Sequence, residues 1–110
     1  PCPAEQIGLA ALRSQARTSL TWADARHGRS DHTRHPWTGA LAVAAGASII
    51  EFHVRLDDTD PGNADYAVAR TPQEALEYVT HIREAEAMLG DGTVAVQDAE
   101  TENLRFRVVP

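Results

Sequence analysis

The stretch "ASIIEFHVRL", residues 47–56, decides the fold. Its β-branched and aromatic residues lie in one short run, which predicts a strand. Side chains alternate along a strand, so the run divides into two faces: Ile50, Phe52 and Val54 on one, and Ile49, Glu51 and His53 on the other. A glutamate and a histidine on an apolar face need polar partners, because burying them unpaired costs several kcal/mol. We therefore expect this strand to end at a polar site.

The predicted strand lies between two further segments with clear signals. Before it, residues 37–45 ("WTGALAVAA") are rich in alanine and predict a short helix. Gly46 is placed to end that helix in a left-handed conformation. After the strand, residues 57–70 read as a loop because they are rich in Asp, Pro, Gly and Asn.

A longer helix is predicted after the loop. Thr71 and Glu74 have the spacing of a capping box, and Pro72 occupies the favoured first helical position. Apolar residues then follow helical spacing as far as Gly90. The sequence therefore predicts one capped helix that ends at this glycine.

Further elements are predicted towards the two ends of the chain. Residues 5–16 contain good helix formers and favour an early helix. Residues 18–33 indicate a short strand that leads into a polar run. Residues 91–110 are typical of a linker, with a short strand at residues 104–109 ("LRFRVV").

The order of these elements predicts an α/β fold. Helix, strand, helix, strand, loop and helix is the rhythm of βα units on a parallel sheet. Functional groups in such folds gather where the strands end, at their carboxyl edge. The polar runs "SDH", residues 30–32, and "EFH", residues 51–53, both lie at predicted strand ends. We expect them to form one site.

Composition restricts the class of protein. The chain has 110 residues, of which 43% are hydrophobic and 24% charged, as expected for one small packed domain. No apolar run approaches the about 20 residues that span a bilayer, and the N-terminus lacks the features of a secretory signal. We therefore expect a soluble, cytoplasmic protein with no membrane partner. The net charge of -6 weighs against a nucleic-acid partner.

Cysteine and lysine usage excludes several kinds of chemistry. A single cysteine, Cys2, permits neither an intrachain disulfide nor a four-cysteine zinc site. All ten basic residues are arginine, so this chain offers no lysine for Schiff-base catalysis. The chain starts without methionine, and we expect it to be a piece of a longer protein.

Two histidines at neighbouring strand ends suggest a metal site. Adjacent parallel strands would bring His32 and His53 within reach of one cation, and two imidazoles suit a divalent ion such as Mn or Zn. A loop histidine and a core histidine with unrelated partners is the competing interpretation. A second candidate is a chelating loop formed by His27, His32 and His35, which has no carboxylate or cysteine partner at a fixed offset.

Other polar residues near these runs have two possible roles. Four arginines flank the histidines: Arg26, Arg29, Arg34 and Arg55. They would either hold a phosphate or carboxylate or keep the loops soluble. Ser30 lacks the glycine elbow of a nucleophile and is better suited to donate its hydroxyl to an anion. His81, on the last predicted helix, is expected to be solvated.

Four motifs together resemble a known family. They are "SDHT" at residues 30–33, "GASIIEFH" at 46–53, "DPGNAD" at 60–65 and "TPQEALEYVTHIREAEAMLGDG" at 71–92. In this order they are similar to the C-terminal part of the catalytic barrel of the sialic acid synthase (N-acylneuraminate synthase) family. That family reads approximately SDHT, VIEKHF, PGPDH and IREAEKALG. The likeness covers most of the chain.

The resemblance implies a fold and a division of the chain. Residues 1–90 would supply about the last three βα units of a (β/α)8 TIM barrel, and residues 91–110 would form a linker towards a C-terminal domain. Full-length family members are expected to be homodimers.

The resemblance also implies a reaction. The family condenses phosphoenolpyruvate with an N-acyl mannosamine-type amino sugar to give a nonulosonic, sialic-type acid. The chain would be a fragment of such a synthase and inactive alone. Two alternatives stay open: a legionaminic or pseudaminic acid synthase of the same family, and a noncatalytic remnant that acts as an interaction module.

Residue roles carry over position by position. The family's metal-binding histidines match His32 and His53, and the ion, Mn or Mg, polarises the sugar aldehyde. Ser30 matches the serine that contacts phosphoenolpyruvate, and we place Asp31 beside it as substrate-binding. Asp65 matches the aspartate that contacts the sugar and a water on the metal. Glu51 and Asp65 are the catalytic candidates.

Two departures from the family pattern affect the site. Phe52 replaces the family's lysine, and by alternation it faces the outer helices rather than the metal. "PGNADY" has one extra residue before Asp65 and places Tyr66 where the family has histidine. The second change is expected to alter the sugar contact.

Overall fold

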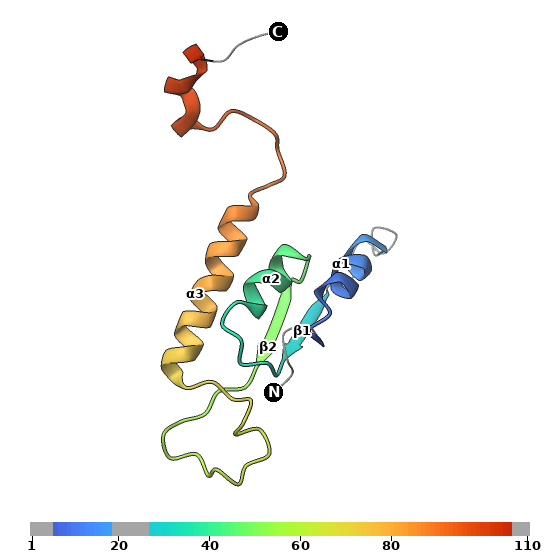
Figure 1. Ribbon diagram of the computed structural model, residues 1–110, viewed down its shortest axis with the longest axis vertical. Coiled ribbons are helices and arrows are strands. Elements are labelled where there is room, and N and C mark those ends of the chain that lie inside the picture. The colour runs from blue at the N-terminus through green and yellow to red at the C-terminus, as the bar shows by residue number, and fades with distance from the viewer. Residues whose placement is uncertain (1–5, 19–26, 107–110) are drawn as a thin grey trace.

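The computed structural model of the chain describes residues 6–18 and 27–106 (Figure 1). Its elements follow the predicted order of helix, strand, helix, strand, loop and helix, with one short helix added at the end. They are α1 (Leu9–Thr18), β1 (Gly28–Asp31), α2 (Thr38–Ala44), β2 (Ile49–Phe52), α3 (Pro72–Leu89) and the 3-10 helix η3 (Asp98–Phe106).

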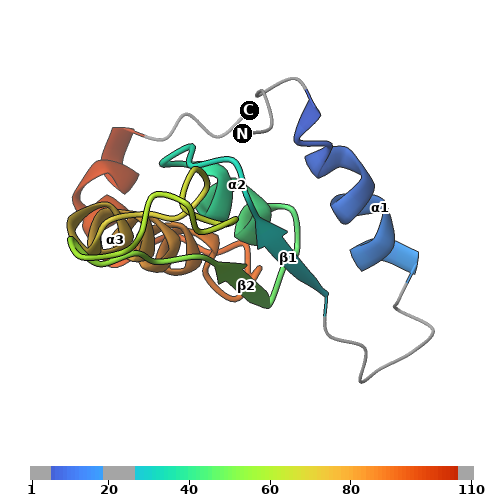
Figure 2. The ribbon, with the colours of Figure 1, turned by 90° about the horizontal axis from the view of Figure 1, so that it is seen from below.

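The two strands form a parallel sheet, as predicted. Residues 28–31 of β1 pair with residues 49–52 of β2 in a constant register, so that Ser30 lies beside Glu51 and Asp31 beside Phe52. Helix α2 connects the strands and, with α3, covers one face of the sheet, while α1 lies beyond β1 (Figure 2). An α/β fold with both polar runs at one edge of the sheet follows.

Alternation along β2 divides its side chains as the sequence predicts. Ile50 packs against a small core that contains Ala42 and Ala47. Phe52 meets the ring of Tyr78 edge-on, with ring centroids 4.9 Å apart. This face of β2 therefore lies against α2 and α3, which leaves Glu51 and His53 on the opposite face.

Small residues let α2 and α3 approach closely. Gly39 is buried in α2, and a Cβ atom built there would lie 2.7 Å from both Ile82 Cδ1 and Tyr78 Cζ. Such a separation leaves no room for a side chain. Gly39 therefore sets the distance between the two helices.

The predicted start of α3 and the predicted ends of α2 and α3 are confirmed. The Thr71 hydroxyl accepts a hydrogen bond from the Glu74 N–H at 3.2 Å, and Glu74 Oε2 accepts one from the Thr71 N–H at 2.8 Å. Gly46 and Gly90 follow α2 and α3 with φ of 107° and 58°. Glycine populates this left-handed region without the steric penalty that a Cβ would bring.

One predicted strand is wrong over part of its length, and another can be compared with the structure only in part. The predicted strand at 104–109 is wrong for its first three residues, which belong to η3. A single strand has no neighbour to pair with, and the acidic run "DAETEN" instead forms tight turns, with Gln97 bonded to Glu100 in both directions. The strand expected within residues 18–33 is observed only from Gly28, because residues 19–26 lie outside the described part of the chain.

Helix length and apolar composition bear on membrane insertion. Within residues 6–18 and 27–106, no helix is both long enough and apolar enough to cross a membrane.

Candidate metal centre

The strand register places two histidines side by side. Paired residues of β1 and β2 differ by 21 in number, and His32 and His53, the next residues along, differ by the same amount. Their Nε2 atoms lie 3.2 Å apart, and their ring centroids 5.0 Å apart. His32 is exposed and His53 half-buried, so the space beyond the two nitrogens is open to solvent.

The spacing of the two nitrogens fits a shared divalent ion. Nitrogen ligands about 2.1 Å from one ion lie about 3.0–3.4 Å apart at octahedral to tetrahedral angles. The observed 3.2 Å falls inside that interval. Imidazole suits Zn and other divalent transition ions, and Mn is suited where oxygen ligands complete the set. Within the described ranges, no group of three or more His, Cys, Asp or Glu side chains is arranged to hold an ion.

A carboxylate lies behind one histidine. Asp65 Oδ2 is 3.6 Å from His53 Nδ1. The Asp65 backbone is held in its loop, since its N–H donates to Asn63 Oδ1 at 2.9 Å and its carbonyl accepts from the Ala69 N–H at 2.8 Å. A carboxylate in this place favours a proton on Nδ1, which leaves the Nε2 lone pair free for a ligand.

A serine and a glutamate complete the exposed cluster. The Ser30 hydroxyl donates to Glu51 Oε1 at 2.8 Å, and Ser30 Oγ lies 3.4 Å from His32 Nε2. Both side chains are exposed. The structure thus brings five of the six predicted site residues together: Ser30, His32, Glu51, His53 and Asp65.

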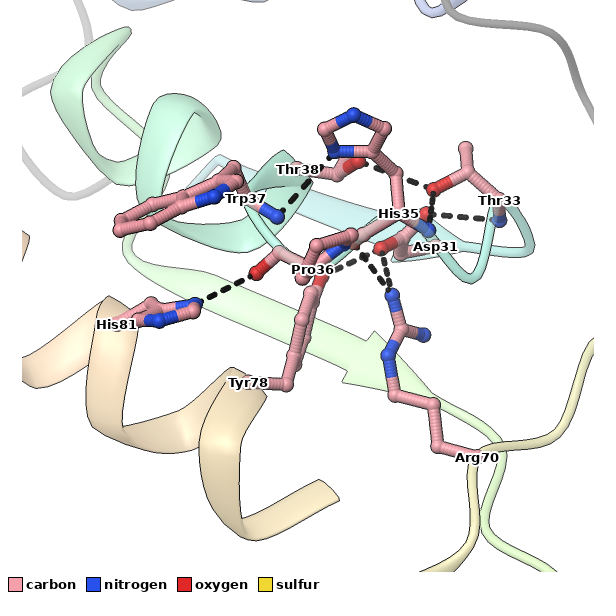
Figure 3. A network of polar contacts seen from close by, with 9 residues as sticks. All are labelled: Asp31, Thr33, His35, Pro36, Trp37, Thr38, Arg70, Tyr78 and His81. Carbon is pink, nitrogen blue, oxygen red and sulfur yellow. Dashed lines mark hydrogen bonds and ion pairs between the residues drawn. The ribbon is translucent and has the colours of Figure 1, made fainter. Parts of the chain in front are cut away.

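Asp31, the sixth predicted residue, occupies a different place from the one expected. It was predicted to contact substrate beside Ser30, but its side chain is 0% exposed (Figure 3). The reason is alternation, because Ser30 and His32 face the site and the residue between them faces α3. Asp31 Oδ2 accepts from Tyr78 Oη at 2.5 Å and from Arg70 Nη2 at 2.9 Å, and Oδ1 accepts from the Thr33 N–H at 2.9 Å.

Arg70 and Tyr78 were not predicted as part of this region. Arg70 is 1% exposed and Tyr78 0%, so both are fully enclosed. Burial raises the pKa of the Asp31 carboxyl. Hydrogen bonds from Tyr78 and Thr33 and the charge of Arg70 together lower it by more, so the pKa lies below its usual value. Burial and the bond to Asp31 raise the pKa of Tyr78 above its usual range. The sequence held one signal for such partners. Asp31 alternates with Ser30 and His32 and so faces the helices, where a carboxylate requires a cation or a hydrogen-bond donor.

Comparison with known proteins identifies the family. The model of the NeuB family matches residues 1–94. The chain belongs to the NeuB family.

Individual NeuB-family relatives support this assignment. An N,N'-diacetyllegionaminic acid synthase of Campylobacter jejuni is 34% identical over 106 residues, which are 96% of this chain and 30% of that protein. The spore coat polysaccharide biosynthesis protein SpsE of Bacillus subtilis is 38% identical over 84% of this chain and 24% of its own length. The chain therefore spans about a quarter to a third of the length of these two relatives.

A solved structure supports the α/β fold. The N-acetylneuraminic acid (sialic acid) synthetase of Leptospira borgpetersenii, crystallised with citrate, superimposes with a TM-score of 0.76. The match covers 97% of this chain and 36% of the synthetase, at 29% sequence identity.

The flanking arginines of this NeuB-family chain contact the protein itself. Arg34 pairs with Glu74, and Arg29 Nη1 donates to the Ile7 carbonyl at 2.9 Å. Arg55 Nη1 donates to the Tyr66 carbonyl at 2.8 Å, and its guanidinium lies over the Tyr66 ring. Arg26 lies outside the described residues. These contacts within the protein count against an anion site at Arg29, Arg34 and Arg55.

The side chains of His35 and His81 have other partners. His35 Nδ1 accepts from the Trp37 N–H at 3.3 Å, which counts against the chelating loop that includes His27. His81 was expected to be solvated, and this is wrong. Its ring stacks on Trp37 at 3.8 Å between centroids, and its Nδ1 lies 3.0 Å from the Pro36 carbonyl (Figure 3).

Proposed function

We propose that this chain carries the metal-binding part of a synthase site that joins phosphoenolpyruvate to an N-acylated amino sugar. The product would be a nonulosonic acid of the sialic type. One observation carries the proposal: two imidazole nitrogens 3.2 Å apart at neighbouring strand ends, with Asp65 behind one of them. We further propose that the chain forms about the last three units of a (β/α)8 barrel, followed from residue 91 by a linker.

His32 and His53 would hold the ion, which we propose to be Mn²⁺ or Mg²⁺. When bound, it supplies Lewis-acid polarisation of the sugar aldehyde. Asp65 Oδ2, 3.6 Å from His53 Nδ1, would favour a proton on that nitrogen, so that Nε2 could act as the electron-pair donor. The exposed oxygens of Asp65 are also free to accept hydrogen bonds from sugar hydroxyls.

Ser30 and Glu51 would face the reacting groups. The Ser30 hydroxyl lies between Glu51 Oε1 and His32 Nε2, at the edge of the site where phosphoenolpyruvate is expected. In the substrate complex we expect Ser30 to exchange its bond to Glu51 for one to the anion. Glu51 would then be free as a proton acceptor.

We propose that these residues do not suffice for turnover. Phosphoenolpyruvate is a phosphate and a carboxylate, and its binding requires several cationic groups. This chain has no lysine, and the described arginines that flank the histidines are engaged with Glu74, Ile7 and Tyr66. The 110-residue chain, mixed with phosphoenolpyruvate, Mn²⁺ and N-acetylmannosamine, should release no phosphate, and clear release would contradict this part of the proposal.

Metal titration tests the central part. Binding of Mn²⁺ to the chain can be followed by the loss of the electron paramagnetic resonance signal of free Mn²⁺. His32→Ala and His53→Ala should each weaken binding by at least about tenfold. His81→Ala is the matched control, because His81 is half-buried but bonds to Pro36, and its affinity should equal the parent's. Equal affinity in all four proteins would refute the site and favour a noncatalytic interaction module.

A second candidate sugar is supported by the relatives. Two of them, from Campylobacter jejuni and Legionella pneumophila, are named N,N'-diacetyllegionaminic acid synthase. The altered "PGNADY" loop is the segment expected to distinguish a singly from a doubly acylated sugar. A chimera in which residues 60–66 replace the matching loop of the Campylobacter enzyme tests this, and unchanged sugar preference would favour a legionaminic acid precursor.

A further inference from the structure

We propose that Arg70 is the positioning residue that holds His32 against His53. The inference rests on the proposed function in one respect, that these two histidines would hold the ion. Arg70 lies outside the four family motifs and touches neither imidazole. It acts through a backbone bond to the His53 carbonyl and through side-chain bonds to Asp31 and His35.

The backbone of Arg70 pairs with the chain just beyond the end of β2. Its N–H donates to the His53 carbonyl at 2.8 Å, and its carbonyl accepts from the Arg55 N–H at 2.8 Å. Val54 and Arg70 therefore form an isolated parallel bridge. These two hydrogen bonds fix the main chain directly after His53, on both sides of Val54, and close the loop that carries Asp65.

The side chain of Arg70 reaches back to the other strand. Its Nη2 donates to Asp31 Oδ2 at 2.9 Å and to the His35 carbonyl at 3.0 Å (Figure 3). These acceptors bracket His32 in the sequence. One residue thus joins the main chain at His53 to the segment that presents His32.

Aromatic packing fixes the guanidinium. Its central carbon lies 3.8 Å from the centroid of the Tyr78 ring and 5.5 Å from that of Phe52. Tyr78 donates to the same Asp31 oxygen as Arg70 does. With Arg70 only 1% exposed, the planar group has little freedom to move. The 3.2 Å separation of the histidine nitrogens is therefore set by a buried contact on the far side of the strands.

A matched pair of variants tests the inference on the full 110-residue chain. Arg70→Met keeps the backbone bonds and the aliphatic length but removes the guanidinium. Arg34→Met is the control, because Arg34 also links the segment after β1 to α3 through Glu74, but makes no bond to Asp31 or His53. Folding is checked by circular dichroism. If Arg70→Met does not fold, the Asp31→Asn/Arg70→Met pair replaces it, since it leaves no buried charge unpaired.

Two measurements separate this inference from the proposed metal site. In metal-free protein, the nuclear Overhauser effect between the His32 and His53 ring protons should be present in the parent and in Arg34→Met, and lost in Arg70→Met. The affinity for Mn²⁺ should fall about tenfold in Arg70→Met and change less than about twofold in Arg34→Met. Folded Arg70→Met that keeps the ring contact, or a parent that lacks it, would overturn the inference. If the ring contact behaves as expected but the parent binds no Mn²⁺, the positioning role stands and the proposed function fails.

Discussion

The end of β1 carries polar side chains in two opposite surroundings, one buried and one exposed. Asp31 is fully buried and accepts hydrogen bonds from Tyr78, Arg70 and Thr33. Ser30 and His32, on either side of it, are exposed and meet Glu51 and His53 at the surface. The difference shows how a strand end can supply both a site and its support, because alternate residues face alternate layers.

The two regions also differ in how firmly their polar groups are held. The hydrogen bonds and the arginine at Asp31 lower the pKa of its carboxyl despite burial, so it stays ionised and tightly held. In the exposed cluster, the Nε2 atoms of His32 and His53 lie 3.2 Å apart, and which of them carries a proton depends on the tautomer of each ring. The buried region therefore determines geometry, and the exposed region is available for ligand.

The largest test of this contrast removes the buried carboxylate. Asp31→Ala leaves Arg70 enclosed without its counter-ion, and we expect the free energy of unfolding to fall by about 3–5 kcal/mol. The control is Asp65→Ala, whose carboxylate is more than half exposed and should cost less than about 1 kcal/mol. Urea unfolding followed by circular dichroism measures both. Similar losses in the two variants would remove the distinction between the regions.

A smaller change removes one bond from the buried region. Tyr78→Phe keeps the ring that packs on Arg70 and Phe52 but deletes the hydroxyl bonded to Asp31. A hydrogen bond to a charged group contributes about 1.5–3 kcal/mol, and we expect a loss in that interval by urea unfolding. Tyr66→Phe keeps the ring and carbonyl that Arg55 contacts, and should unfold within about 0.5 kcal/mol of the parent. A loss at Tyr66 as large as that at Tyr78 would contradict the prediction.

A glycine substitution tests how tightly the supporting layer is packed. Gly39→Ala places a methyl group 2.7 Å from Tyr78 Cζ, and the ring cannot withdraw without lengthening its bond to Asp31. We expect a net loss of about 1–2 kcal/mol in thermal or urea unfolding, although alanine favours the helix. Gly62→Ala, in the exposed loop, meets Asp60 Oδ1 at 3.3 Å and should be close to neutral. If Gly39→Ala is stabilising, helix propensity outweighs packing at this interface.

The smallest effect concerns the start of α3. The hydrogen bond from the Thr71 N–H, and then Arg34, lower the pKa of Glu74 below its usual 4.5. A lowered carboxyl pKa means that its contribution is present above the unfolded pKa and is lost as the pH falls through the folded value. Between about pH 6 and pH 3, Glu74→Gln should therefore lose less stability than the parent, by under about 1 kcal/mol. Glu77→Gln, on the same helix, should behave as the parent, and a parent-like acid response in Glu74→Gln would contradict this assignment.

The elements with strong local signals were predictable from the sequence. The capping box at Thr71 and the glycine that follows α3 are chemical patterns within a few residues, and both occur where expected. The tail was not predictable in the same way, because a strand depends on a partner that local sequence cannot specify. Within the described part of the tail, residues 98–106 form η3 instead.

The candidate site was predicted only in part, because some of its contacts follow from local sequence and others depend on distant residues. Alternation and the order of elements were enough to bring His32 and His53 to one edge of a parallel sheet, and the structure places them in contact. The burial of Asp31 was not predicted, since its neighbours Ser30 and His32 both point to the site. Its true partners, Arg70 and Tyr78, are 39 and 47 residues away in the sequence.

The sequence by itself therefore determined the α/β order, the helix ends and the pairing of the two histidine-bearing strand ends, because these follow from local propensity and from a period of two along each strand. Only the tertiary structure decided which polar residue of "SDH" is buried and that Arg70 spans from His53 to Asp31. The physical reason is that a buried charge is placed by whichever distant group can neutralise it, and that partner is fixed by packing rather than by spacing along the chain.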